Sequence, residues 1–179
     1  GKSCVAKLIS TFTWIEKALV RGDYAISDFS AVKFRKTYCG YHRIANYFFN
    51  NAHSDAAEIE YEGEAYSMKY QKGDFQISEK QSRKYFLPQI MYVPAERNFI
   101  SIIKEAKSFK SLPDSLLEYI TEFNNAKDEI KDGLSLPIND AEIKYDKQHD
   151  VINVTGSDYQ VELSEASSGF QSLVPLYLV

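Results

Sequence analysis

Two stretches of this chain alternate apolar and polar residues with a period of two, and this pattern restricts the fold more than any other feature. The first stretch covers residues 57–77, with turn residues at Gly63-Glu64 and at Lys72-Gly73-Asp74. Residues two apart on a strand share a face, so this stretch has one apolar and one polar face. Strands joined by such short turns pair antiparallel. We therefore predict an antiparallel meander with one face open to water.

The second stretch, residues 143–163, has the same alternation. Turn residues interrupt it at 147–150 and at Gly156-Ser157-Asp158. It predicts a second antiparallel meander, which leads directly into an apolar segment at the end of the chain.

The polar face of the first meander carries Glu58, Glu60 and Glu62. Three carboxylates on one strand face could bind a metal ion. They could also form a solvated face opposite Ile59 and Tyr61, and the regular alternation favours this second interpretation.

Other segments have the three-to-four-residue period of a helix. Residues 4–19 form the clearest case, with Gly22 as the predicted C-cap; their apolar face consists of Val5, Leu8, Ile9, Phe12, Ile15 and Leu19. Residues 113–131 predict another helix with Asp114 or Ser115 as its N-cap.

The segments between these elements have weaker patterns. Residues 26–34 predict a loop with a short strand, and residues 35–50 contain a short helix. The apolar run Gln89–Val93 is typical of a fully buried strand, and a helix through Ile102, Ile103 and Ala106 is expected to follow.

The composition predicts a folded chain in a reducing compartment. Of its 179 residues, 44% are hydrophobic and 26% charged, which excludes a disordered chain. The net charge of −4 argues against a strongly basic nucleic-acid module but leaves a local basic groove open. We find no signal-peptide layout and no run long enough to span a bilayer. Two cysteines without a disulfide pattern indicate a cytoplasmic protein.

Cys39, His42 and His53 superficially suggest metal ligands. A structural zinc site needs four ligands, and no second cysteine or histidine pair completes this set. We therefore reject a zinc site.

The first three residues, Gly1-Lys2-Ser3, open directly onto the predicted helix 4–19. The N–H groups and the positive dipole end of a helix favour an anion. A lysine there can reach terminal phosphates, and a serine hydroxyl can complete the ligands of Mg²⁺. This arrangement is that of the second half of a phosphate-binding loop. The alternative is an ordinary helix start with a glycine and a serine near its cap.

Two further segments carry polar residues where predicted elements meet. Glu96 and Arg97 follow the predicted buried strand in Pro94-Ala95-Glu96-Arg97; they could form a site or an ion pair that only holds the loop. Ser167-Ser168-Gly169-Phe170-Gln171 begins an apolar helix, and its hydroxyl groups and glycine suit phosphate oxygens.

In this order, the three segments resemble the head of an ABC-type or SMC-like ATPase of the AAA family, with RecF, SMC and OLD-type proteins as relatives. Ser167–Gln171 is similar to the signature motif Leu-Ser-Gly-Gly-Gln/Glu of these ATPases. Ala166, Ser168 and Phe170 depart from it, and Cys4 stands where many P-loops have a second hydroxyl residue. Glu96-Arg97 occupies the place of the glutamine loop that senses Mg²⁺ and the γ-phosphate, without a glutamine.

The resemblance implies an α/β fold with α+β character, a P-loop NTPase head with antiparallel meanders and a helical lobe. It implies one domain, incomplete at both ends, with a nucleotide-binding lobe over residues 1–98. The helical lobe, second meander and signature would cover residues 99–179. The first glycines of the P-loop are expected upstream, and the Walker B strand and catalytic glutamate beyond Val179.

The resemblance also implies a function, an ATPase that dimerises on ATP with Mg²⁺ as cofactor. Gly1, Lys2, Ser3 and Cys4 would bind phosphate, with Ser3 as a Mg²⁺ ligand. Ser167, Ser168, Gly169 and Gln171 would bind the γ-phosphate on the partner of a homodimer. Relatives act in DNA repair or phage defence, which leaves DNA or an associated nuclease open as a partner. The alternative is a β-rich module that binds a protein or another ligand and has no nucleotide activity.

Overall fold

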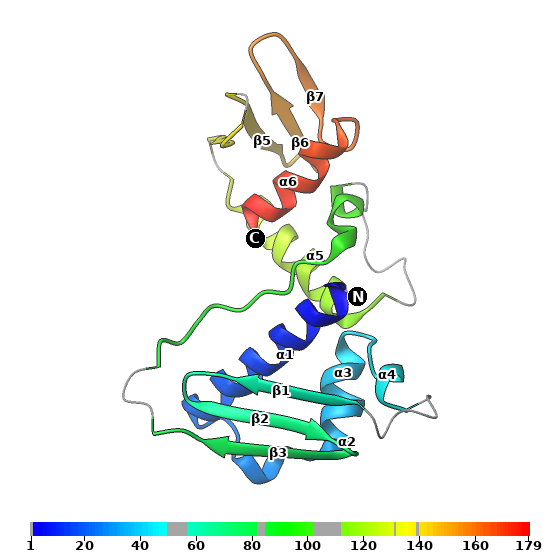
Figure 1. The fold of residues 1–179 in the computed structure, drawn as a ribbon. Coiled ribbons are helices and arrows are strands. Elements are labelled where there is room, and N and C mark those ends of the chain that lie inside the picture. Colours follow the sequence, from blue (N-terminus) through cyan, green and yellow to red (C-terminus); the bar gives the residue numbers. More distant parts are fainter. Residues whose placement is uncertain (1, 50–56, 82–84, 102–111, 131, 139) are drawn as a thin grey trace. The chain divides into compact units, whose positions relative to one another are not determined.

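The computed structural model describes residues 2–49, 57–81, 85–101, 112–130, 132–138 and 140–179 (Figure 1). The chain is a mixed α+β protein with antiparallel sheets, as predicted at this coarse level. Its contacts divide it into two compact units, Gly1–Tyr92 and Val93–Val179. The lobe boundary expected near residue 98 lies a few residues after this division.

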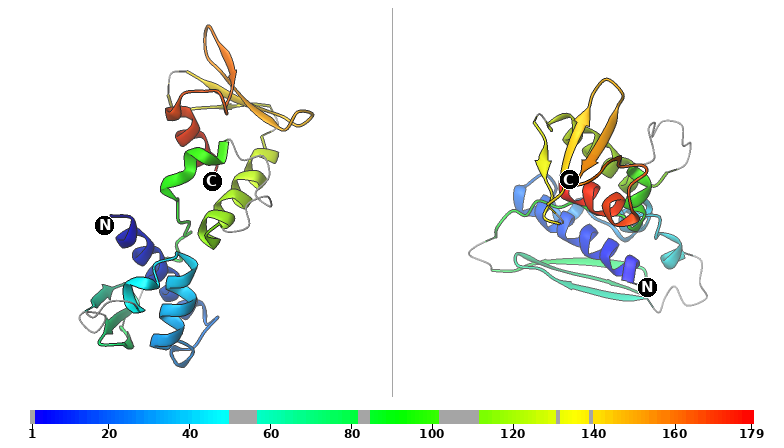
Figure 2. Two further views of the ribbon diagram at one scale, coloured as in Figure 1. Left: turned by 90° about the vertical axis from the view of Figure 1, so that its right-hand side faces the viewer. Right: turned by 90° about the horizontal axis from the view of Figure 1, so that it is seen from above.

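The first unit is a two-layer arrangement of helices on one face of a three-stranded sheet (Figures 1 and 2). Helix α1 (Lys2–Arg21) confirms the predicted first helix, and Gly22, with φ +74°, follows its end as the predicted cap. Strands β1 (Glu58–Glu62), β2 (Tyr66–Gln71) and β3 (Asp74–Glu79) pair antiparallel in the order β1-β2-β3. The first predicted meander is therefore confirmed.

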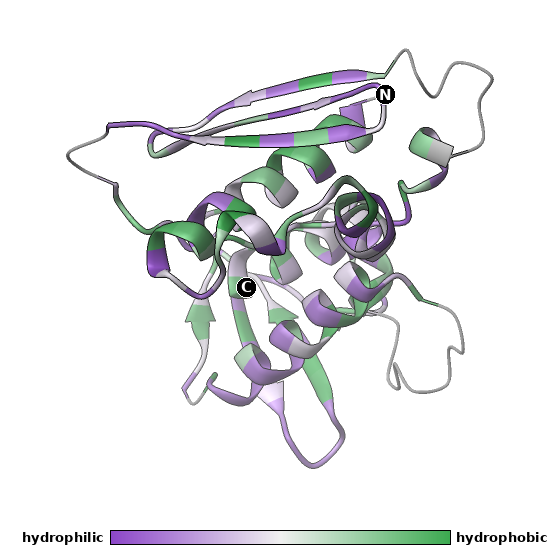
Figure 3. Cartoon of the chain, turned by 90° about the horizontal axis from the view of Figure 1, so that it is seen from below, coloured by the Kyte–Doolittle hydropathy of each residue, from purple (hydrophilic) through white to green (hydrophobic). Residues whose placement is uncertain are grey.

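The sheet has the two faces that the alternation predicted, and Figure 3 shows the change of hydropathy from residue to residue along the strands. Met68 lies between Tyr61 and Ile77 in the register and faces the core. On the opposite, exposed face, Lys69 Nζ lies 2.6 Å from carboxylate oxygens of both Glu58 and Glu60. The solvated face is confirmed, since these glutamates are exposed and bound to a lysine.

Residues 26–49 are helical throughout most of their length. They form η1 (Ile26–Asp28), α2 (Ala31–Lys33), the π-helical turn η2 (Phe34–Tyr38), α3 (Cys39–Tyr41) and α4 (Asn46–Phe49). The short strand predicted within 26–34 is wrong. The Ser30 side chain accepts a hydrogen bond from Lys33 N and starts a helix instead.

The π-helical turn has a packing reason. Phe34 and Cys39 are five residues apart, and both are fully buried. The hydrogen bond from Cys39 N to Phe34 O closes the wider turn that directs both side chains into the core. The first core is largely aromatic; it contains Phe12, Ile15, Leu19, Phe29, Phe34, Cys39, Ile44, Phe48, Met68, Tyr70 and Phe75.

Residues 85–94 form an extended connection with no strand, so the buried strand predicted at Gln89–Val93 is wrong. Met91 is 36% exposed, and Ile90 is half-buried. Lys17 Nζ donates to Pro88 O at 2.6 Å and fixes the segment by a side-chain contact. Prolines at 88 and 94 lack the N–H that a ladder requires, which disfavours a strand between them.

The second unit packs helices against a four-stranded antiparallel sheet (Figures 1 and 2). Among its described residues, the helices are η4 (Ala95–Ser101), α5 (Asp114–Asp128) and α6 (Ser168–Leu178). Its strands, in the order β4-β5-β6-β7, are β4 (Leu134–Ser135), β5 (Glu142–Asp146), β6 (Val151–Thr155) and β7 (Gln160–Glu162). The second predicted meander is confirmed.

The start of α5 differs from the prediction. Its N-cap is Pro113, whose carbonyl accepts from both Leu116 N and Leu117 N, rather than Asp114 or Ser115. Ser115 is buried inside the first turn. The helix predicted through Ile102, Ile103 and Ala106 lies outside the described residues.

The second core is mainly aliphatic. It contains Ile100, Leu116, Tyr119, Ile120, Phe123, Ile130, Leu136, Ala141, Ile143, Ile152, Val154, Leu163, Ala166 and Val174. Helix η4 packs against α6, and α5 contacts α6 as well. Among the helices of the described residues, none has the length and apolar character to cross a bilayer.

Candidate functional site

Lys2 and Ser3 occupy the first turn of α1, a helix of 20 residues, and both side chains are exposed. This first turn contains no acidic residue. The positive end of the helix dipole is therefore not neutralised by a carboxylate of the same turn. Cys4 is half-buried, and Gly1 lies outside the described residues.

Tyr92 lies beside this turn, although it is 89 residues away in the sequence. Its hydroxyl is 3.4 Å from Ser3 Oγ, which is too long for a strong hydrogen bond. Its ring meets the His42 ring edge-on at 4.9 Å between centroids. Lys7 Nζ lies 5.9 Å from the centre of the Tyr92 ring and donates to His42 O at 3.0 Å. Residues from two other segments, Tyr92 and His42, thus lie beside the first two turns of α1.

The sequence reasoning did not find Lys7 or Tyr92 as neighbours of Ser3. Lys7 follows Ser3 by four residues, the spacing of one helix face, and this signal was available. Tyr92 could not be placed, because its segment was predicted as a buried strand.

His42 is a buried base with a strongly shifted pKa. Its side chain is 3% exposed. Burial, together with the nearby Lys7 ammonium, lowers the pKa of His42 to about 4. Its Nδ1 has no hydrogen-bond partner among the described residues. The imidazole is therefore neutral at pH 7.

Cys39 is packed in the core of the first unit. Burial, with Cys4 as a second cause, raises the pKa of the Cys39 thiol to about 12. A thiol with this pKa is a poor metal ligand and nucleophile at neutral pH. His53, the third member of the rejected zinc set, lies outside the described residues.

Glu16 is a buried carboxylate that the sequence reasoning missed. It is 2% exposed, and it accepts hydrogen bonds from Tyr61 Oη at 2.8 Å, Ala65 N at 2.7 Å and Tyr66 N at 3.0 Å. It therefore fastens the β1–β2 turn to α1. A Cβ at Gly63 would overlap Glu16 Oε1, so a side chain at this position would displace the carboxylate from the two N–H groups that it accepts.

The segment predicted as a signature lies at the start of α6. Ser167 is the N-cap, and Ser167, Ser168 and Gly169 are exposed. The Ser167 side chain makes no capping hydrogen bond. Gln171 Nε2 donates to Ser164 O at 2.8 Å, so its amide holds the preceding loop.

Glu96 and Arg97 belong to η4, which packs against α6. The structure thus brings the predicted sensor segment and the predicted signature helix together within the second unit. Glu96 is exposed, whereas Arg97 Nε is buried without a hydrogen-bond partner among the described residues. Burial raises the pKa of Tyr119 to about 12, an effect that the Arg97 charge opposes. Lys2, Ser3 and Cys4 belong to the other unit.

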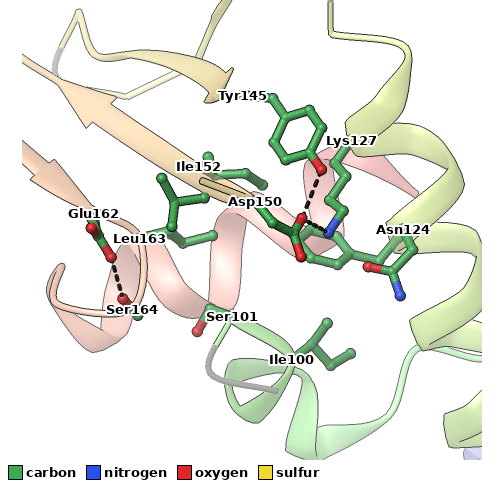
Figure 4. Close-up of a pocket in the computed structure, with 12 residues that line it drawn as sticks. Ile100, Ser101, Asn124, Lys127, Tyr145, Asp150, Ile152, Glu162, Leu163 and Ser164 are labelled. Atoms are coloured by element: carbon green, nitrogen blue, oxygen red, sulfur yellow. Dashed lines mark hydrogen bonds and ion pairs between the residues drawn. The ribbon is translucent and has the colours of Figure 1, made fainter. Parts of the chain in front are cut away.

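A hollow of about 40 Å³ lies between α5 and the second sheet (Figure 4). On its wall, Asp150 Oδ1 accepts from Lys127 Nζ at 2.6 Å and from Tyr145 Oη at 2.7 Å. The hydrogen bond to Asp150, followed by burial, raises the pKa of Tyr145 to about 12. The hollow has room for a few water molecules, far less than a nucleotide needs. This trio fastens α5 to the β5–β6 turn.

Comparison of the chain with models of protein families, with curated proteins and with solved structures found no match.

Proposed function

We propose that this chain is part of an ABC-type or SMC-like ATPase head that binds ATP and Mg²⁺ through the first turn of α1. The observation that carries the proposal is the exposure of Lys2 and Ser3 at the start of a 20-residue helix whose first turn has no acidic residue. Such a turn offers unpaired N–H groups, a lysine charge and a hydroxyl to a phosphate.

The side chains of Ser3 and Lys2 suit Mg²⁺ and the phosphates of ATP. Ser3 Oγ makes only a long contact with Tyr92, so the hydroxyl can turn toward a cation that prefers oxygen ligands. Lys2 is exposed and can reach a terminal phosphate. Lys7 is held by His42 O and adds positive charge one turn further along. ATP·Mg²⁺ would supply the phosphoanhydride bond whose hydrolysis the ATPase performs.

Within the same proposal, α6 presents its N-terminus to the γ-phosphate bound by a second copy of the head. Ser167, Ser168 and Gly169 are exposed and engaged in no side-chain cap, which leaves their donors open to a phosphate oxygen. In this proposal the active unit is a homodimer. Glu96 and Arg97 are proposed as sensors of the bound nucleotide.

Binding of a fluorescent ATP analogue with Mg²⁺ tests the proposal, comparing wild type with Lys2→Ala. Loss of a charge-assisted contact of about 1.5–3 kcal/mol predicts that the variant binds roughly tenfold to a hundredfold more weakly. Lys147→Ala, which removes an exposed lysine in the β5–β6 turn, is the matched control and should bind like wild type.

Equal affinities of wild type and Lys2→Ala would contradict the proposal. That result would favour the alternative, in which the two meanders form an interaction module and the glycine-lysine-serine triplet is only a helix start.

A further inference from the structure

The charges of the first unit are distributed unevenly. Residues 2–49 carry eight lysines and arginines and three acidic residues, a net charge of +5, although the whole chain carries −4. One of the three acids, Glu16, is buried against the sheet. None of the eight basic residues is buried; they are Lys2, Lys7, Lys17, Arg21, Lys33, Arg35, Lys36 and Arg43.

The open face of the sheet has the opposite character. Its strands present Glu58, Glu60, Glu62 and Asp74 to water; Lys69 is bound to Glu58 and Glu60, and Lys80 to Glu62, so the carboxylates still outnumber these lysines by four to two. The unit therefore has an acidic sheet face and a basic helical layer. A polyanion would be attracted to the helices and repelled by the sheet.

Four aromatic rings form a closed cluster in the helical layer. Trp14 lies 5.9 Å from Tyr24 and 5.5 Å from Tyr38, measured between ring centroids. Phe29 lies 5.7 Å from Tyr24 and 5.6 Å from Tyr38 and completes the cycle. Trp14 and Tyr24 are 40% and 39% exposed, whereas Phe29 is buried beneath them.

A lysine lies on this cluster. The Lys33 ammonium is 5.3 Å from the centre of the Tyr24 ring and 5.7 Å from that of Phe29. Exposed rings beside cations are the arrangement by which proteins bind single-stranded nucleic acid, since bases stack on the rings and phosphates contact the charges.

We propose that the surface formed by Trp14, Tyr24, Tyr38 and Lys33, here named the aromatic–basic surface, binds single-stranded nucleic acid. The rings favour this ligand over a duplex, whose bases are stacked on one another and offer no free face. The same rings favour it over an acidic polypeptide, which would use the charges alone. The inference does not depend on ATP binding at Lys2 and Ser3.

Trp14 is the only tryptophan of the chain, so its fluorescence reports directly on this surface. The experiment titrates the 179-residue protein, at low salt and without nucleotide, with a 20-residue oligothymidine. A stacked base should quench the emission, and polyglutamate of equal charge should leave it unchanged. The affinity of labelled oligothymidine should fall with salt, with a log–log slope of roughly −0.7 for each phosphate contacted.

Variants of Tyr24 separate stacking from charge. Tyr24→Leu keeps the apolar bulk and removes the ring, and it should weaken oligothymidine binding about fivefold or more. Tyr24→Phe keeps the ring and should bind like wild type. Tyr159→Leu is the matched control, since Tyr159 is a tyrosine of the second unit that is 40% exposed.

Two results would overturn the proposal. One is equal or tighter binding of polyglutamate, which would make this a surface for acidic proteins. The other is an affinity of Tyr24→Leu equal to that of Tyr159→Leu, with both variants folded by circular dichroism. Both results are obtained without nucleotide, so they do not depend on whether Lys2→Ala binds ATP.

Discussion

The two units share one arrangement of helices and sheet, but their cores consist of different kinds of side chain. Each packs helices on one face of an antiparallel meander. The first core is built on packed aromatic rings; the Phe34 ring stacks on Phe75 at 4.6 Å and meets the Tyr70 ring at a tilt at 5.4 Å, both measured between ring centroids. The second core is mainly aliphatic, around Ile143 and Val154. Rings of fixed shape tolerate fewer replacements than branched aliphatic side chains, so the first unit should be the more sensitive to substitution.

The units also differ in how helix and sheet are fastened together. In the first, the buried carboxylate of Glu16 accepts two backbone N–H groups of the β1–β2 turn. In the second, the link is the more exposed trio of Lys127, Tyr145 and Asp150. A buried polar link costs more to break than an exposed one, because its partners are left without water.

The largest expected effect is that of Phe34→Ala. Removing a fully buried ring that contacts four other rings should lower the free energy of unfolding of the first unit by about 4 kcal/mol. Urea unfolding, monitored in each unit by hydrogen exchange, measures this loss of free energy. Ile143→Ala in the second core truncates a buried side chain to the same residue and is the comparison; it should cost about 2 kcal/mol, because aliphatic neighbours can repack around the cavity. Similar losses for the two variants would contradict the proposed difference between the cores.

Glu16→Ala should come next, with a loss of about 3 kcal/mol. It leaves the Tyr61 hydroxyl and the N–H groups of Ala65 and Tyr66 without their acceptor. Glu16→Gln keeps one carbonyl oxygen and should lose less. Thermal unfolding gives the comparison, with Glu62→Ala on the exposed sheet face as the control. If Glu16→Ala is as stable as Glu62→Ala, the carboxylate does not fasten the turn.

The third effect depends on pH. The pKa of His42 is about 4 in the folded chain and about 6.5 when unfolded, so the unfolded state binds more protons between these values. The stability that neutral His42 contributes is therefore lost as the pH falls below about 6.5. Between pH 7 and pH 5 the loss should be about 2 kcal/mol.

Urea unfolding of wild type and His42→Phe at both pH values measures this effect. The variant has no base at this position and should show a smaller loss on acidification. An identical pH dependence of the two proteins would show that His42 is protonated as readily in the folded chain as in the unfolded one.

Much of the local structure could be predicted from the sequence because its physical cause is local. The period-two pattern around Tyr61 and Met68 determines both the strands and their wet face. The apolar spacing that includes Phe12 and Ile15 determines α1, and Gly22 determines where it ends. Each of these signals depends on residues within a few positions of one another.

The errors arose where a local pattern competes with a distant contact. The apolar run Gln89–Val93 resembled a buried strand, yet Lys17, 71 residues from Pro88, holds the segment as an extended connection. The wide turn at Phe34 and Cys39 exists because both side chains have to reach the same core. The spacing of neighbouring residues in the sequence does not predict such distant contacts.

The candidate sites divide in the same way. The sequence by itself determined that Lys2 and Ser3 start a helix and that Ser167, Ser168 and Gly169 start another, because helix starts follow from local residue types and periodicity. Only the tertiary structure decided that Tyr92 and His42 lie beside the first helix and that Trp14, Tyr24, Phe29 and Tyr38 form one cluster. The reason is physical: burial of apolar surface, which is not directional, draws together side chains from segments far apart in the chain.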